Sequence, residues 1–236
     1  MQMERIALNL RAELRDLRFS RPAAYVYNPL EYAWAPHAEY IHRYGVGKRE
    51  IVLVGMNPGP WGMVQTGVPF GDLEMVRDWL GITGRVTRPA TEHPKRPVEG
   101  FSCHRGEISG RRLWGWARAA FGTPRCFFAR IFVVNYCPLC FFDADGKNLT
   151  PDRLKTGDHG PLFASCDRAL RAAIDLLEAR LVIGIGRFAE KRARQALAGM
   201  DLTIACAPHP SGANPQASRD WGGQMTATLK ALGINP

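Results

Sequence analysis

Three polar side chains, Asn57, Asn135 and His209, each lie within a few residues of the end of a short apolar run. An amide carries both a hydrogen-bond donor and an acceptor, and a neutral imidazole can donate to an oxygen that gains negative charge. Together such groups could bind a polar ligand and stabilise charge on it. Turn chemistry is the alternative for each residue, because Asn, Gly and Pro are common in loops. Because three polar residues share the same kind of position, turn chemistry explains the whole set less well than it explains any one of them.

Four apolar runs rich in β-branched residues must position these side chains. They are residues 51–54, 131–134, 181–183 and 202–205. Continuous runs of this length are typical of strands buried on both faces, as in a parallel sheet. Ligands bind beyond the carboxyl ends of parallel strands, so the three side chains are expected in one cleft.

Helical apolar spacing recurs between and after these runs. It is found in residues 113–121, 162–179, 188–197 and 225–232. Strands that alternate with helices predict an α/β fold, namely a three-layer α/β/α sandwich with a central four-stranded parallel sheet.

Residues 81–112 form a long stretch with many Gly and Pro residues and little periodicity. A loop of that length is usually functional or mobile, and this one carries Arg85, Arg88, Lys95 and Arg96. Because no linker and no internal repeat is visible, residues 1–236 are interpreted as a single domain.

The first 18 residues mix charged side chains with Ile6, Leu10, Leu14 and Leu17 at helical spacing. This pattern predicts an amphipathic helix and does not fit a secretory signal. We therefore expect an intracellular protein. In a bacterium it would be cytoplasmic and associated with the nucleoid, and in a eukaryote it would be nuclear.

The chain of 236 residues has 31 Lys and Arg against 22 Asp and Glu, a net charge of +9. With 46% hydrophobic residues it is too apolar for a disordered chain. It has no run of ~18 apolar residues that could span a membrane. The charge favours a polyanion such as nucleic acid as partner, and a basic enzyme without such a partner is the alternative.

The six cysteines are expected to be reduced thiols in an intracellular protein. Cys137 and Cys140 form the one close pair. Four thiolates could hold zinc or an iron–sulfur cluster, but no second pair and no His stand at ligand spacing. We therefore expect no metal and no cofactor.

Several long segments resemble the motifs of the single-strand-selective monofunctional uracil-DNA glycosylases. Residues 55–71 resemble the first motif, residues 209–217 the second, and residues 135–139 the base-reading strand end. Further matches are residues 27–33, 93–98 and 107–110. Motifs of this length and order are far more specific than a lone glycine pattern.

The resemblance implies the uracil-glycosylase α/β/α sandwich and a monomeric enzyme of base-excision repair. Such an enzyme flips uracil, and 5-hydroxymethyluracil or related oxidised or deaminated bases, out of single- and double-stranded DNA. Water then hydrolyses the N-glycosidic bond and leaves an abasic site. The alternatives are a catalytically inactive DNA-binding module that keeps the pocket, and an unrelated nucleotide-binding enzyme with glycines at residues 184–186.

The same resemblance implies roles for particular residues. His209 donates to the pyrimidine oxygen where charge develops, and Asn57 positions the water. The residues implied to line the base pocket are Met56, Gly59, Phe70 and Asn135. In that pocket Phe70 stacks on the base, Asn135 reads its edge, and Gly59 leaves room for a substituent on carbon 5.

The DNA contacts implied by the resemblance come from two loops and the basic stretch. They are Gln65, Lys95, Arg96, Ser211, Gly212, Ala213, Asn214 and Arg219. Ala213 departs from the family pattern, which has a basic wedge residue there to fill the gap left by the flipped base. The departure puts the efficiency on duplex DNA in doubt more than the chemistry.

Overall fold

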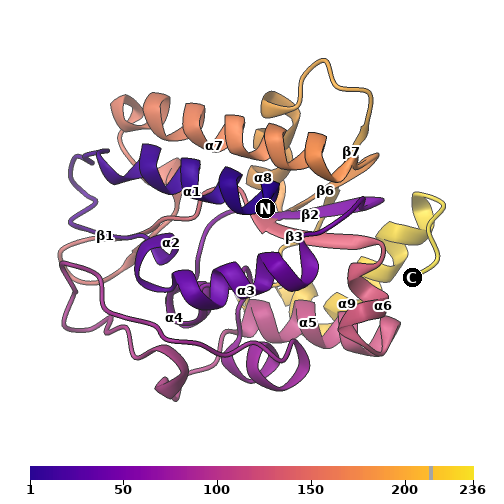
Figure 1. Ribbon diagram of the computed structural model, residues 1–236, viewed down its shortest axis with the longest axis horizontal. Helices are drawn as coiled ribbons and strands as arrows, with labels where there is room; N and C mark the ends of the chain where they lie inside the picture. The colour runs from indigo at the N-terminus through magenta and orange to yellow at the C-terminus, as the bar shows by residue number, and fades with distance from the viewer. Residues whose placement is uncertain (213–214) are drawn as a thin grey trace.

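Four parallel strands form the centre of the protein (Figure 1). The computed structural model describes residues 1–212 and 215–236, except for the side chains of 215–219. The strands are β2 (Ile51–Gly55), β3 (Ile131–Asn135), β6 (Leu181–Ile185) and β7 (Thr203–Ala207), in the spatial order β3-β2-β6-β7. All are parallel, and every residue of β2 and β6 is buried. The predicted four-stranded parallel sheet is confirmed.

Helices cover both faces of this sheet and complete the predicted three layers (Figure 1). One face carries α1 (Gln2–Arg15), α7 (Thr156–Leu177) and α8 (Arg187–Ala196). The other carries α3 (Trp34–Tyr44), α5 (Ile108–Phe121), α6 (Pro124–Phe128) and α9 (Pro215–Ala231). The amphipathic pattern of the first segment is realised in α1, which buries Met3, Ala7, Leu10 and Leu14 along one stripe.

A small antiparallel sheet lies beside the main one and was not predicted. It consists of β1 (Tyr25–Tyr27), β4 (Cys140–Phe142) and β5 (Asn148–Leu149), in the order β1-β4-β5. Strands this short give no alternation that a sequence pattern could reveal. They connect directly to the end of β3, so the loop that follows Asn135 is held at both of its ends.

The predicted long loop is shorter than expected at its carboxyl end. Between the π-helical turn Met75–Trp79 and α5, the one helical element is the 3-10 turn Gly100–Ser102. However, α5 begins at Ile108, so residues 108–112 are helical and not part of the loop. Apolar spacing does not mark this first turn as helical, because a glycine stands at position 110. The backbone of Gly110 packs against the Phe70 carbonyl, where a Cβ atom would collide.

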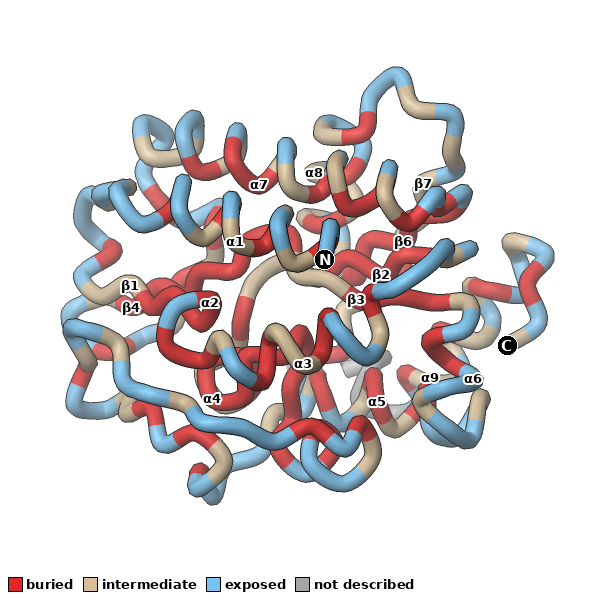
Figure 2. Tube along the Cα trace, in the orientation of Figure 1, coloured by how far each residue is buried: buried red, intermediate tan, exposed pale blue. Residues whose placement is uncertain are grey.

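Burial follows this layering, as Figure 2 shows: the strands and the inner sides of the helices are buried, and the outer turns are exposed. Two further short helices, α2 (Pro29–Tyr32) and α4 (Met63–Thr66), lie in the segments before and after β2. In the described part of the chain, no helix is both long and apolar enough to span a bilayer.

Candidate active site

The carboxyl end of the sheet carries the three predicted polar residues. Gly55 of β2 pairs with Asn135 of β3, and the two strands continue in parallel for a short distance beyond their ends. There the Tyr136 N–H donates to the Gly55 carbonyl at 2.9 Å, and the Cys137 N–H to the Met56 carbonyl at 2.9 Å. The loops that carry Asn57 and Asn135 are thus fixed side by side.

Asn135 and Phe70 converge above Gly55. A Cβ atom at position 55 would collide with Oδ1 of Asn135 and lie 2.5 Å from Cε2 of Phe70. The glycine therefore lets an amide oxygen and an aromatic ring share one small space at the strand end. Gly55 was not predicted as a site residue, although it directly follows the apolar run 51–54 and begins the segment 55–71 that resembles the first family motif.

Phe70 has a backbone conformation that is rare for an aromatic residue. Its φ angle is 53°, in the left-handed region that strongly favours glycine. Its carbonyl accepts hydrogen bonds from Trp114 Nε1 at 3.0 Å and from the Asp72 N–H at 2.7 Å. Such conformations persist only where the surroundings impose them, and they cluster at functional sites. The backbone at Phe70 is therefore held in a defined conformation.

The two asparagine amides each have one anchored nitrogen. Asn57 Nδ2 donates to the Leu139 carbonyl at 3.2 Å, and among the described residues its Oδ1 accepts no hydrogen bond. Asn135 Nδ2 donates to Met63 Sδ at 3.3 Å, and a thioether is a weak acceptor. Both side chains are half-buried, so each can still offer polar atoms to a ligand or a water.

His209 lies half-buried past the end of β7 and has a defined tautomer. The Ser211 N–H donates to Nδ1 at 3.2 Å, which places the ring proton on Nε2. Burial lowers the pKa of His209 below its ordinary value, so the ring is neutral near pH 7. A neutral imidazole with a proton on Nε2 is a hydrogen-bond donor for an oxygen that gains charge.

The loop around His209 is fixed by two side chains that the sequence did not reveal. Arg112 Nη1 donates to the carbonyls of Pro210 and Ser211 at 2.8 and 2.9 Å. Trp221 Nε1 donates to the Pro208 carbonyl at 2.7 Å. Both contacts join residues far apart in the chain through backbone atoms, so no local pattern marks them.

The space next to Gly59 is filled by Glu107. A Cβ atom at Gly59 would collide with the Glu107 carboxylate, and one at Gly62 would lie 2.9 Å from Glu107 Cγ. Burial raises the pKa of Glu107, the backbone N–H groups of Ser109 and Trp61 oppose this, and the Asp72 charge adds to it. The absence of a side chain at Gly59 thus makes room for the Glu107 carboxylate. Glu107 was not predicted as a site residue.

Gln65 requires a correction, because the structure does not present it to DNA. The side chain is 0% exposed. Its Nε2 donates to the carbonyls of Pro60 and Pro97 at 3.1 and 2.9 Å. Its Oε1 accepts from the N–H groups of Glu99 and Gly100 at 2.8 and 3.1 Å. With every polar atom used by the backbone, Gln65 ties two loops together.

Two arginines of the long loop lie against an indole ring. The guanidinium groups of Arg96 and Arg105 lie 5.4 and 4.3 Å from the centre of the Trp61 ring. Arg96 Nε also donates to the Gly146 carbonyl at 2.7 Å, while Lys95 is exposed and reaches the Asp145 carbonyl at 3.4 Å. These cations lie on the segment next to the Asn57 loop.

The remaining predicted DNA contacts lie in and after the His209 loop. Ser211 is half-buried and Gly212 is exposed. Ala213 and Asn214 lie outside the described residues, as does the side chain of Arg219. Within the described chain, no three His, Cys, Asp or Glu side chains gather as a metal-binding group.

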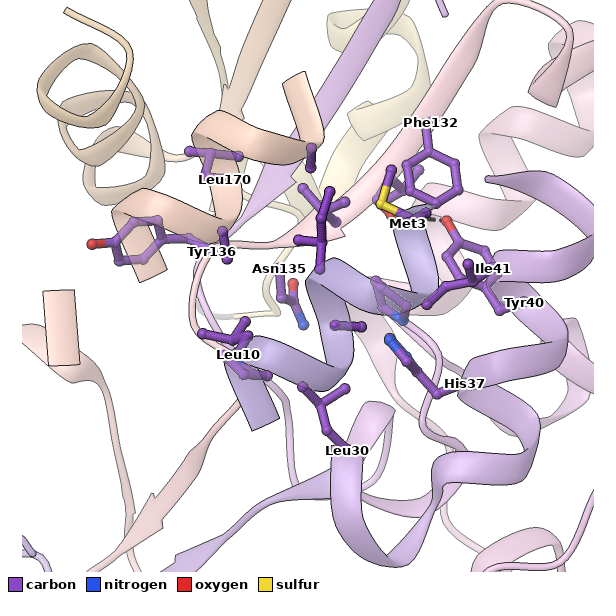
Figure 3. Close-up of a pocket in the computed structure, with 18 of the residues that line it drawn as sticks. Met3, Leu10, Leu30, His37, Tyr40, Ile41, Phe132, Asn135, Tyr136 and Leu170 are labelled. Atoms are coloured by element: carbon purple, nitrogen blue, oxygen red, sulfur yellow. Dashed lines mark hydrogen bonds between the residues drawn. The ribbon is translucent and has the colours of Figure 1, made fainter. Parts of the chain in front are cut away.

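A separate cavity of about 90 Å³ lies behind Asn135, between α1, α3, α7 and β3 (Figure 3). Its walls are mainly apolar, with His37 and Asn135 among the few polar side chains. Asn57, Phe70 and His209 do not line it. Of the residues predicted to line the base pocket, Asn135 is the one that borders this cavity.

Comparison with known proteins places these features in context. The family model described as the uracil DNA glycosylase superfamily matches residues 42–232. Single-strand selective monofunctional uracil-DNA glycosylases from Rattus norvegicus and Bos taurus are 48% and 47% identical to this chain over 231 residues. The alignments cover 97% of this chain and 83% and 85% of theirs. The crystal structure of Pedobacter heparinus SMUG2 has a similar fold, with a TM-score of 0.68 at 18% identity over 97% of this chain and 98% of that one.

Proposed function

Because the chain belongs to the uracil DNA glycosylase superfamily, we propose that it excises uracil from DNA by hydrolysis and leaves an abasic site. It is a DNA N-glycosylase, and the relatives named above are uracil-DNA glycosylases. Further details of the proposal are activity on single- and double-stranded DNA, and acceptance of 5-hydroxymethyluracil and related oxidised or deaminated bases.

The observation that carries the proposal is the hydrogen bond from the Ser211 N–H to His209 Nδ1, which leaves the ring proton to Nε2. When the N-glycosidic bond breaks, negative charge grows on the pyrimidine oxygens. A fixed donor aimed at that charge stabilises the transition state without reorganisation, and one such donor typically contributes about 100- to 1000-fold in rate. Arg112 and Trp221 hold the His209 loop and keep this donor in place.

Base binding in this proposal uses the space above Gly55. The Phe70 ring stacks on the flipped base, and the Asn135 amide pairs with a carbonyl and an adjacent ring N–H of uracil. Cytosine has a different donor and acceptor pattern at that edge. It would leave buried polar groups unpaired, which is a strong basis for discrimination.

Asn57 orients the attacking water in this proposal. The Leu139 carbonyl fixes its amide nitrogen, so Oδ1 is the atom that can accept a hydrogen bond from water. An amide cannot act as a general base near pH 7. The barrier therefore falls mainly through charge stabilisation on the leaving base, and chemistry is slower than with an aspartate at this position.

DNA binding draws on the positive charge of +9. In this proposal Arg96, Arg105 and Lys95 contact phosphates near the Asn57 loop, and the position of both arginines beside Trp61 supports this. Such contacts give an affinity that falls with salt and carries no base information. Specificity then rests on the uncharged residues around Gly55.

The acceptance of 5-substituted uracils rests on the environment of Gly59. No side chain projects from this position, and the half-buried carboxyl group of Glu107 lies against it. A carboxyl group can accept a hydrogen bond from a hydroxyl. A 5-hydroxymethyl or 5-hydroxy group is therefore a better fit to this environment than a methyl group.

The test is excision from synthetic oligonucleotides that contain uracil, cytosine or 5-hydroxymethyluracil at one position. The expected result is an alkali-labile abasic site at uracil and 5-hydroxymethyluracil and none at cytosine. Borohydride should trap no covalent adduct, because water and not an amine is the nucleophile. Binding to uracil-containing DNA without cleavage would instead identify an inactive module.

A further inference from the structure

Ile108 is a large apolar side chain that stands exposed at the edge of the active site. It is the first residue of α5 and is 54% exposed. Among the described residues, the other large apolar side chains this exposed are Met1 at 48% and Val46 at 55%. Met1 begins the chain, and Val46 precedes β2, at the opposite end of the strands from Asn57. Of these three exposed apolar side chains, Ile108 is therefore the one that lies beside the candidate active site.

The neighbours of Ile108 belong to the loops that carry the proposed chemistry. The preceding residue, Glu107, places its carboxylate against Gly59 in the Asn57 loop. On the other side, a Cβ atom at Gly212, in the His209 loop, would lie 3.5 Å from Ile108 Cδ1. Ile108 therefore stands between the two loops that would close around a flipped nucleotide.

Three arginines, Arg105, Arg111 and Arg112, lie within four residues of Ile108 in the chain, and Arg111 forms an ion pair with Asp72. Arg105 and Arg111 are exposed, and Arg112 donates hydrogen bonds to the carbonyls of Pro210 and Ser211. A protruding apolar side chain among cations fits a partner with an anionic exterior and an apolar interior. Duplex DNA is such a partner, because its phosphates flank a stack of bases.

We propose that Ile108 is a wedge that enters the base stack of duplex DNA when uracil leaves it. The inference rests on the proposed glycosylase function. Apolar side chains, isoleucine among them, are used by other proteins to part base steps in this way. Ala213, at the place of the expected wedge residue, has only a methyl group and cannot fill the gap. Ile108 would supply that missing bulk from the first turn of α5.

The test compares kcat/KM on single-stranded and duplex uracil oligonucleotides for the wild type, Ile108→Ala and Ile108→Phe. Val46→Ala is the matched control, since Val46 is equally exposed and far from the site. For Ile108→Ala we expect an about tenfold loss on a duplex with a U·A pair, a smaller loss with a U·G mismatch, and less than about twofold change on single strands. Ile108→Phe should keep or raise duplex activity.

A second readout follows the bases directly. In a duplex with 2-aminopurine beside the uracil, fluorescence should rise on binding the wild type and rise less with Ile108→Ala. An unchanged ratio of duplex to single-strand activity in Ile108→Ala, or a wild type inactive on duplexes, would overturn the wedge. A wild type that cleaves neither kind of DNA would overturn the proposed function itself.

Discussion

The Ser211 N–H donates a hydrogen bond to Nδ1 of His209 at 3.2 Å, and this contact decides what the imidazole can do. It fixes the remaining proton on Nε2, so the ring can donate but not accept at that atom. Burial makes the neutral form the stable one. In catalysis the neutral ring would therefore donate a hydrogen bond to the pyrimidine as it leaves with negative charge.

This strategy predicts the dependence of excision on pH. Because burial lowers the pKa of His209 below the ordinary value of 6.5, the ring stays neutral as the pH falls past that value. The single-turnover rate on single-stranded uracil DNA should be level from pH 8 through 6.5 and fall only at lower pH. The measurement is a quenched-flow or manual time course at each pH. An inflection at or above pH 6.5 would argue against a neutral ring.

Asn57 gives a second prediction. Asn57→Ala removes the amide oxygen that would orient water, while the backbone and the loop remain. We expect at least an about tenfold lower single-turnover rate, with the affinity for uracil DNA nearly unchanged. Asn9→Ala, on the exposed side of α1, is the matched control. If Asn57→Ala cleaves as fast as the wild type, the water has another source of orientation.

Gly59 and Glu107 should behave as a coupled pair. In Gly59→Ala the new Cβ atom would collide with the half-buried Glu107 carboxylate, so this side chain and the loop that carries Asn57 must rearrange. A shift of this kind should lower kcat/KM on uracil and on 5-hydroxymethyluracil by at least about tenfold. Combining Gly59→Ala with Glu107→Ala relieves the collision and should recover part of the loss, which a double-mutant cycle measures.

The control for this cycle is Gly115→Ala in α5, where a Cβ atom meets nothing within 4 Å. If the losses of the two single variants simply add, the contact between Gly59 and Glu107 has no energetic consequence.

His37 predicts an acid-sensitive component of stability. Burial lowers its pKa to about 4, although the hydrogen bond with the Gly67 carbonyl raises it in part. Below pH 6.5 the unfolded chain takes up a proton that the folded chain accepts only near pH 4. The free energy of unfolding should therefore fall by about 3 kcal/mol between these two values and then level off.

Urea unfolding between pH 7 and 4 measures this component. His37→Gln keeps a donor for the Gly67 carbonyl but cannot take up the proton, so its stability should depend less steeply on pH. Equal slopes for the wild type and His37→Gln would show that other groups carry the acid sensitivity.

The strands and layers of the fold could be predicted because local sequence patterns mark them. Apolar runs such as residues 51–54 and 131–134 are buried on both faces, and the strands Ile51–Gly55 and Ile131–Asn135 extend them by one residue each. Once the strands are known, the rule that parallel strands present their carboxyl ends together places Asn57, Asn135 and His209 at one edge.

The contacts that complete the site could not be predicted, because they join distant segments through backbone atoms. Arg112 holds the carbonyls of Pro210 and Ser211, and Gln65 binds four backbone groups. A sequence pattern marks a side chain as polar but does not say which carbonyl it will meet. For this reason Gln65 was assigned to DNA, and Glu107 and Arg112 were missed.

The measurement that tests the central claim most directly is single-turnover excision of uracil by His209→Ala. We expect a rate about 100- to 1000-fold below the wild type, with a similar affinity for uncleaved uracil DNA. His104→Ala, an exposed histidine in the long loop, should behave like the wild type. A His209→Ala enzyme that excises uracil at the wild-type rate would contradict the role of His209 and the mechanism built on it.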